Sequence, residues 1–229
     1  MLNRVCLLFF IGLFNLLIIP HCHADIDTGL LGRYDFVRIQ SSHDSSGYGT
    51  TAASIAQNFE LKDNLTISAW VYFYDLQGWQ TLLGQDTLSW SGGNAAFYLN
   101  KANPFPRCGR FGNQFNIYLA VSANSCDPGD WAGGTTVPVP YTWYMVTGTY
   151  DGSNMKLYVN GVLEGTSPRT GNIGMQTGQL NIGSGFYGGN QVDYVDGVVD
   201  YARVYNRALS DDDVAELYRH QHNAHAIAQ

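Results

Sequence analysis

The sequence predicts an all-β protein made of antiparallel strands, and three observations support this fold class. Short segments in which apolar and polar residues alternate are separated by tight turns, most clearly between residues 143 and 165. The chain of 229 residues contains 26 glycines and 15 tyrosines, a composition typical of loop-rich β proteins. Nearly all of the acidic residues are aspartate, which is favoured in turns and in calcium sites.

The first 24 residues have the pattern of a secretory signal peptide. Arg4 gives a positive start, residues 5–19 form an apolar run, and residues 22–24 form a cleavage motif with small outer residues. The run is shorter than the roughly 20 residues that a membrane-spanning helix requires, and no later stretch qualifies. We therefore expect secretion, to the extracellular space or the periplasm, after cleavage near Ala24. A lipid-modified Cys22 is the less favoured alternative.

The expected elements of the first half of the mature chain are short strands separated by Gly-, Asn- and Asp-rich turns. The strongest is 65–74, where apolar side chains occur on both faces, so we expect both faces to be covered. We expect strands over residues 30–36, 51–55, 58–61, 65–74, 81–84, 87–90, 96–99 and 115–121.

An antiparallel meander is expected between residues 143 and 165. Residues 143–150 alternate with period two, and residues 151–154 (D-G-S-N) suit a turn. A second strand then leads to Asn160-Gly161, the preferred pair for a type I′ hairpin turn, in which both residues need a positive φ. A third strand begins directly after this pair.

The chain is expected to close with a strand over 195–205 and a short helix that begins at Ser210. Ser210 suits the N-cap position, and three aspartates follow it in the first turn, where the helix dipole favours acidic groups. Val214, Leu217 and Tyr218 form an apolar stripe for docking on the sheet. We expect a single domain over residues 25–220, followed by a flexible tail over 221–229.

Cys108 and Cys126 are the two cysteines that remain after signal cleavage. An even pair in a secreted chain indicates one disulfide. Closing a loop of this length would stabilise the fold by about 3 kcal/mol in the chain-entropy model.

Three blocks carry a family resemblance. Residues 65–71 read L-T-I-S-A-W-V, residues 143–161 read W-Y-M-V-T-G-T-Y-D-G-S-N-M-K-L-Y-V-N-G, and residues 180–218 include L-N-I-G and R-V-Y-N-R-A-L-S. Together they resemble the laminin-G-like, concanavalin A-like lectin-glucanase jelly-roll domains. The resemblance implies a two-sheet antiparallel jelly-roll sandwich with a short C-terminal helix. The chain departs from the family pattern before residue 65, where fewer residues are available for the early strands.

The resemblance also implies a structural calcium ion that joins the opening loop to the closing strand. Asp44, the backbone near Gly47, and Asp200 match the positions expected to supply its oxygen ligands. The alternative is that Asp44 caps a turn and that Asp200 pairs with Arg203 or Arg33.

The loops between residues 100 and 140 have the side chains expected of a sugar site, as does the G-F-Y-G-G-N segment. Aromatic rings stack on sugars, and Arg and Asn bind hydroxyl groups. The candidate ligand-binding residues are Phe105, Arg107, Arg110, Asn113, Trp131 and Tyr187. The alternative is that the loop aromatics form a small core around the disulfide. Trp70 and Trp143 lie inside strands and are expected to be core residues.

The favoured function is therefore extracellular binding of a glycan or glycoprotein without catalysis. A net charge of −7 argues against nucleic acid as a partner. No two glutamates lie close together in the sequence, whereas a glucanase of this superfamily needs paired carboxylates on one strand. A polysaccharide-degrading enzyme and a structural or adhesion module that binds protein are the alternatives.

Overall fold

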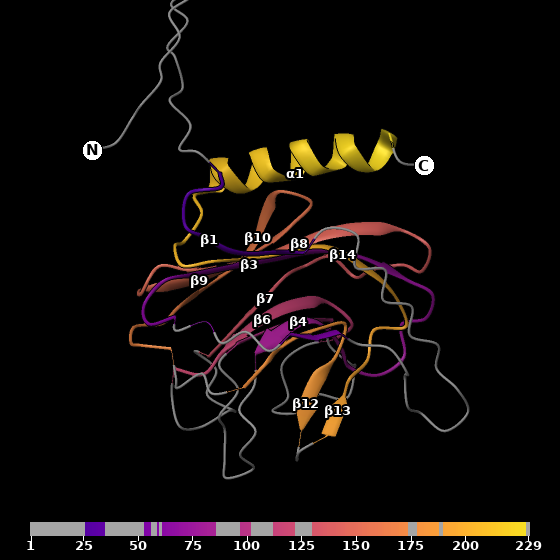
Figure 1. Cartoon of the computed structure of the whole chain (residues 1–229), viewed down its shortest axis with the longest axis horizontal. Coiled ribbons are helices and arrows are strands. Elements are labelled where there is room, and N and C mark those ends of the chain that lie inside the picture. The colour runs from indigo at the N-terminus through magenta and orange to yellow at the C-terminus, as the bar shows by residue number, and fades with distance from the viewer. Residues whose placement is uncertain are drawn as a thin grey trace, which may run out of the picture.

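The protein is a sandwich of two antiparallel sheets with one helix packed on the outside (Figure 1). This computed structural model describes residues 26–34, 53–55, 59, 61–85, 97–101, 112–121, 130–173, 178–187 and 190–227, and only the backbone of 53–55, 186, 187, 190, 191 and 224–227. The expected all-β jelly-roll sandwich is confirmed.

The first sheet, sheet A, has six strands and contains the meander. Its strands, in spatial order, are β1 (Leu30–Tyr34), β14 (Gly197–Tyr205), β3 (Leu65–Phe73), β8 (Trp143–Tyr150), β9 (Asn154–Val159) and β10 (Val162–Pro168). The first and last parts of the chain therefore lie beside each other, because β1 pairs with β14.

The second sheet, sheet B, also has six strands and faces the first. Its strands, in spatial order, are β2 (Ala53–Ile55), β11 (Leu180–Ile182), β4 (Gln80–Gln85), β5 (Phe97–Lys101), β6 (Phe115–Leu119) and β7 (Trp131–Gly133). A separate hairpin of β12 (Gly185–Tyr187) and β13 (Asn190–Val192) lies on the far side of sheet B from sheet A (Figure 1).

The main core fills the space between the sheets. The strands that line it contribute alternate side chains, as the period of two requires. Its most deeply buried members include Leu65, Ile67, Phe73, Leu83, Phe97, Leu99, Phe115, Ile117, Val146, Leu157, Ile182 and Val199. Gly148 is required here because a Cβ at this position would lie 2.3 Å from Cδ1 of Ile117.

The hairpin turn between β9 and β10 has the expected geometry. Asn160 has φ 51° and Gly161 has φ 79°, as a type I′ turn needs. The Asn160 side chain adds a contact that the sequence pattern did not predict, since its Oδ1 accepts a hydrogen bond of 2.9 Å from the Met145 backbone N–H.

Strand boundaries before residue 65 differ from the prediction. Residues 58–61 were expected to form a strand, but Phe59 and Leu61 lie in none. Both side chains are buried in the core instead, and the Leu61 N–H donates to the Phe59 carbonyl at 3.0 Å. Burial at alternate positions explains the strand-like pattern, which does not require pairing with another strand. The expected strand at 87–90 lies outside the described residues.

Helix α1 (Asp211–Ile227) begins as predicted. The Asp213 N–H donates to Ser210 Oγ at 3.1 Å, and the Ser210 N–H donates to the Asp213 carboxylate at 3.2 Å, a reciprocal cap. Burial alone would raise the pKa of Asp213, but hydrogen bonds from Arg207 and from the Ser210 backbone outweigh it, and the pKa is lowered. The cap is therefore strongest when Asp213 is ionised.

The helix continues past the point where the sequence predicts a tail. The expected end was residue 220, but α1 extends through Ile227. Trp70 explains the extension, because its Nε1–H donates to Oε1 of Gln221 at 2.6 Å and Gln221 is buried. This contact joins residues far apart in the sequence, so the pattern of neighbouring residues does not predict it. The described residues contain no helix that is long and apolar enough to cross a membrane.

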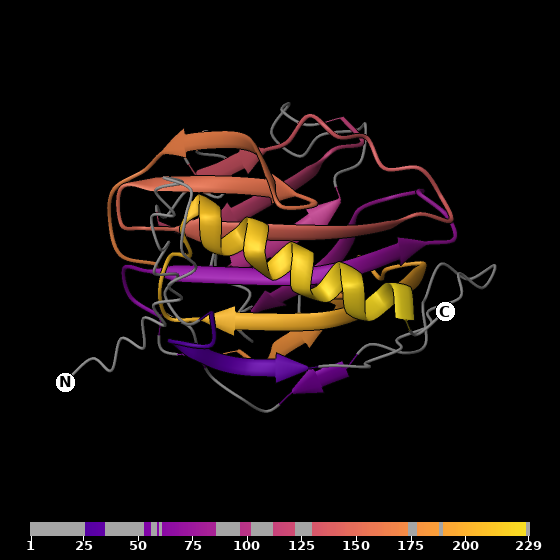
Figure 2. The same cartoon turned by 90° about the horizontal axis from the view of Figure 1, so that it is seen from above.

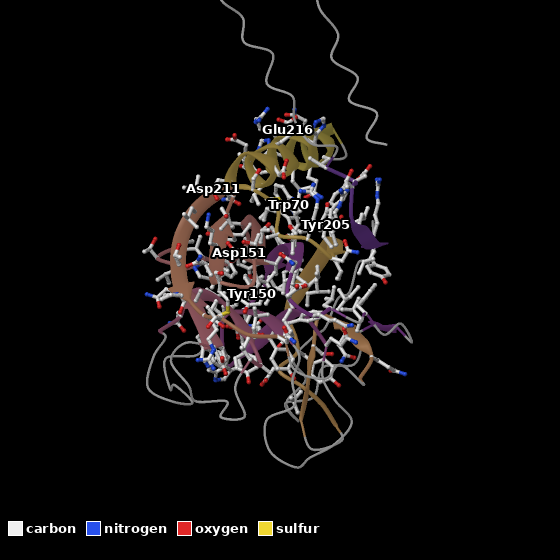
Figure 3. The ribbon with its side chains drawn as sticks, turned by 90° about the vertical axis from the view of Figure 1, so that its left-hand side faces the viewer. Trp70, Tyr150, Asp151, Tyr205, Asp211 and Glu216 are labelled. Atoms are coloured by element: carbon white, nitrogen blue, oxygen red, sulfur yellow. The ribbon has the colours of Figure 1, made fainter. Side chains whose placement is uncertain are left out.

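A second cluster of buried residues, the helix-side cluster, joins α1 to sheet A. It contains Trp70, Met145, Tyr158, Tyr201, Tyr205, Leu209, Val214 and Leu217. Trp70 lies between the sheet and the helix, stacked on Tyr218 with ring centroids 5.6 Å apart (Figure 3). Trp70 is therefore a core residue as expected, and Trp143 packs half-buried against the same cluster.

Candidate functional site

The outer face of sheet B carries two parallel rows of side chains. On β5, Phe97 and Leu99 point into the core, so Tyr98 and Asn100 point outward. Tyr98 is paired with Tyr118 of β6, and Asn100 with Asn116. One row is therefore aromatic and the other consists of amides.

The aromatic row continues across the strands by ring-to-ring contact. Tyr98 stacks on Tyr118 with centroids 6.1 Å apart and 25° between planes, and Tyr118 lies 4.6 Å from Trp131 of β7. Gly84 of β4 leaves space for the first ring, because a Cβ there would lie 2.3 Å from Cδ1 of Tyr98. The absence of a side chain at Gly84 is therefore what allows the ring of Tyr98 to lie over β4.

Trp79 meets Trp131 across this face. Their ring centroids are 6.1 Å apart, although Trp79 directly precedes β4 and Trp131 begins β7. Because β5 and β6 lie between β4 and β7, the two indoles must reach toward each other over the middle strands. Both are half-buried, so part of each ring remains accessible.

The turn that precedes Trp79 is held in place by a buried lysine. Lys101 Nζ donates to the carbonyl of Leu76 and, at 2.9 Å, to that of Gly78. Burial lowers the pKa of Lys101 to about 8, opposed by the negative charge of Asp75. The side chain of Lys101 is fully enclosed, so its role is to fix the turn and thereby the starting point of the Trp79 side chain.

The amide row has unused hydrogen-bonding capacity. Asn100 is 3% exposed and Asn116 is 0% exposed. Oδ1 of Asn100 and both polar side-chain atoms of Asn116 find no hydrogen-bond partner within the described part of the chain. A buried amide without a partner costs about 1–3 kcal/mol. A ligand that carries both donors and acceptors, such as a polyol, would satisfy these atoms once the side chains that enclose them move aside.

Comparison with known families identifies the fold. The profile of the concanavalin A-like lectin/glucanases superfamily matches residues 43–215. The chain belongs to this superfamily. Comparison with curated protein sequences gives no match.

Solved structures of similar fold include two domains of glycan-processing enzymes and one pentraxin. The CBM40 module of a Ruminococcus gnavus IT-sialidase has 16% identity and a TM-score of 0.64, covering 83% of this chain and 100% of that one. Domain 4 of a Geobacillus stearothermophilus arabinanase, in complex with arabinotriose, has 15% identity and a TM-score of 0.54, covering 82% and 98%. A SAP-like pentraxin from Limulus polyphemus has 14% identity and a TM-score of 0.58, covering 86% and 84%. At these identities the likeness shows the fold alone.

The expected ligand-binding residues of this concanavalin A-like domain are only partly described. Trp131 lies in the aromatic row. Asn113 is half-buried in the bend that leads into β6, at the end of that strand away from Tyr118. Tyr187 ends β12, where only the backbone is described. The remaining candidates and the two cysteines lie outside the described residues: Phe105, Arg107, Arg110, Cys108 and Cys126.

Sequence reasoning missed most of the outer face because it looked for ligand contacts in loops. Tyr98, Tyr118, Asn100 and Asn116 all lie within strands. The available signal was strand parity, since each alternates with apolar residues that had to face the core. Trp79 gave no such signal, because it stands outside a strand.

Asp200 is the described member of the expected calcium site. It is 7% exposed, and its Oδ1 accepts a hydrogen bond of 2.7 Å from the Tyr201 backbone N–H. Tyr201 has φ 47°, at a bulge in the pairing of β14 with β3. Asp44 and Gly47 lie outside the described residues, and the residues that are described hold no group of three metal-ligating side chains. The buried carboxylate of Asp200 is a suitable calcium ligand, and the expected site also requires the carboxylate of Asp44.

The two described glutamates have structural contacts. Oε2 of Glu164 accepts hydrogen bonds from the backbone N–H groups of Thr135 (2.8 Å) and Thr136 (2.9 Å), which tie β10 to the segment after β7. Glu216 lies on α1, where it forms an ion pair with Arg219 and its Oε1 lies 2.8 Å from Nε2 of His220. Each carboxylate thus stabilises local structure.

Proposed function

We propose that this domain binds carbohydrate, without catalysis, on the outer face of sheet B. The observation that carries the proposal is the pairing of the two rows: four aromatic rings in contact beside buried amides that lack partners. Ligand sites in general combine aromatic surface with a few well-placed polar groups. A sugar fits this combination, because it presents an apolar C–H face to an indole and hydroxyl groups to an amide.

Membership of the lectin/glucanase superfamily supports a glycan ligand. Two of the similar structures were solved with sugars, the CBM40 module with α2,3-sialyllactose and the arabinanase domain with arabinotriose. These ligands belong to those proteins. They make the two sugars reasonable first probes for this one.

The absence of catalysis and the location outside the cell are parts of the same proposal. Glu164 and Glu216 have structural roles, which argues against either as an acid or nucleophile. The signal-like first 24 residues support secretion, and so an extracellular glycan or glycoprotein as the partner. A structural calcium held by Asp44, Gly47 and Asp200 would join the opening loop of the domain to its closing strand.

A glycan array followed by calorimetry on the mature domain tests the proposal. We expect binding to at least one glycan class, and a loss of about tenfold or more in affinity for Trp131→Ala. Asn116→Leu should weaken binding about 3–10-fold, since one neutral hydrogen bond contributes about 0.5–1.5 kcal/mol. It should not lower stability, because it removes a buried amide that has no partner in the free protein.

Thr166→Ala is the matched control, since Thr166 is exposed on β10 of the other sheet and should leave binding unchanged. Wild-type affinity in both the Trp131→Ala and Asn116→Leu variants would show that the outer face of sheet B is not the site. No binding to any glycan would refute the function itself.

A further inference from the structure

A second group of aromatic rings lies on the opposite side of the molecule, on sheet A. We call Tyr72, Tyr74, Tyr141 and Trp143 the tyrosine platform. Tyr72 is its centre, with centroid distances of 5.7 Å to Tyr74, 6.2 Å to Tyr141 and 5.3 Å to Trp143. Tyr72 lies two residues beyond Trp70 on β3, and therefore on the same face of the sheet. Figure 2 shows α1 crossing this sheet obliquely.

Tyr141 has an unusual backbone for an exposed aromatic residue. It is 68% exposed and has φ 62°. It follows Pro140, and a proline followed by a positive φ is the order found in type II turns, where Gly or Asn normally takes the second position. Its N–H donates to the Phe73 carbonyl at 2.8 Å, which holds it in place.

Burial offsets only a small part of the backbone strain at Tyr141. A left-handed conformation costs about 1–2 kcal/mol for a residue with a side chain, and a ring that is mostly exposed recovers little of it by burial. Strain of this kind, where the surroundings enforce it, is found at binding sites. The turn thus presents the ring of Tyr141 beside those of Tyr72 and Tyr74.

The size and chemistry of the platform favour a small ligand over a protein. An aromatic side chain has about 150–250 Å² to bury, and three of the four are already half-buried. The free area is therefore on the order of 300 Å², below the roughly 800 Å² per partner of a stable protein interface. The four side chains are uncharged and three end in a hydroxyl group, which suits a neutral sugar ring.

We propose that the tyrosine platform is a second saccharide-binding surface, selective for neutral glycans and independent of the outer face of sheet B. This rests on the proposed carbohydrate-binding function and extends it to both sheets. One domain could then hold two chains of a polysaccharide, or two distant parts of one chain. Two linked contacts raise the overall affinity without any new interaction at either site.

Fluorine NMR of the mature domain labelled with 5-fluorotryptophan can observe both surfaces at once. Each tryptophan signal is assigned by a Trp→Phe variant, and the probes are arabinotriose, cellotetraose and xylotetraose, with α2,3-sialyllactose as the anionic comparison. We expect at least one neutral probe to shift the Trp143 signal, also in the Trp131→Ala variant. Sialyllactose should shift it less.

Tyr141→Asn separates binding from folding. Asparagine accepts a positive φ, so stability should be kept or raised, whereas the shift of Trp143 should require at least tenfold more sugar. Tyr141→Phe keeps the ring and should keep the shift. A Trp143 signal that responds to none of the neutral probes would overturn the platform, as would an unchanged response in Tyr141→Asn.

The two proposals fail in different ways. Shifts at Trp131 without shifts at Trp143 overturn the platform and leave the site on sheet B standing. Shifts at Trp143 that persist while Trp131 and Trp79 stay silent support the platform and overturn the site on sheet B. Silence at all three tryptophans, together with no binding on the glycan array, overturns both.

Discussion

Replacing Gly161 by alanine should destabilise the protein through two separate effects. Gly161 has φ 79°, so any side chain there is strained. A Cβ would also lie 3.0 Å from Cβ of Tyr218 and 3.3 Å from Cα of Ala215. The hairpin turn is thus pressed against α1, and the second effect acts on the helix.

The two effects can be separated with a matched variant. Gly78 has φ 71°, but a Cβ there would meet nothing within 4 Å. Gly78→Ala should therefore lower the free energy of unfolding by about 1 kcal/mol. This figure is the strain of the left-handed backbone minus the gain from a less flexible unfolded chain. Gly161→Ala adds overpacking against the helix, about 1–3 kcal/mol, for a total of about 2–4 kcal/mol. At about 2–4 °C per kcal/mol for a chain of this length, the melting temperature should fall by about 2–4 °C and 4–16 °C, respectively.

Urea denaturation followed by tryptophan fluorescence, together with thermal melts, measures both variants. Equal losses for Gly161→Ala and Gly78→Ala would show that the turn does not press on α1. A Gly161→Ala variant as stable as the wild type would refute the positive φ at the turn, and with it the register assigned to β9 and β10.

Three further predictions concern the disulfide, calcium and acid stability. Intact mass of secreted protein, alkylated with and without prior reduction, should show Cys108 and Cys126 bonded; two free thiols without reductant would contradict this. Millimolar calcium should raise the melting temperature by about 5–10 °C relative to EDTA, and Asp200→Asn should reduce this rise. Identical wild-type melting temperatures in the two buffers would refute the calcium site. The lowered pKa of Asp213 means that its carboxylate stabilises the fold above the unfolded pKa near 4, and that this stability is lost as pH falls toward the folded pKa. Asp213→Asn should therefore lose less stability on acidification than Asp212→Asn, and parallel acid profiles would refute the role of the cap.

The elements that the sequence determined by itself depend on neighbouring residues. The Asn160-Gly161 turn follows from the few residue types that accept a positive φ, and the start of α1 follows from Ser210 and the acidic residues after it. The two-faced pattern of 65–74 likewise predicts a strand covered on both sides, as β3 is. These signals are local, so they do not depend on what the rest of the chain does.

The tertiary structure decided the contacts that join distant residues. The polar sequence after residue 220 gives no sign of a helix anchored by Gln221, because its partner, Trp70, lies on β3. Trp79 and Trp131 are far apart in the sequence and meet because β4 and β7 belong to the same sheet, although β5 and β6 lie between these strands. The candidate site is therefore a product of strand order and register, which alternation along one strand cannot specify: the period of two fixes the face of each side chain, and pairing with other strands fixes its neighbours.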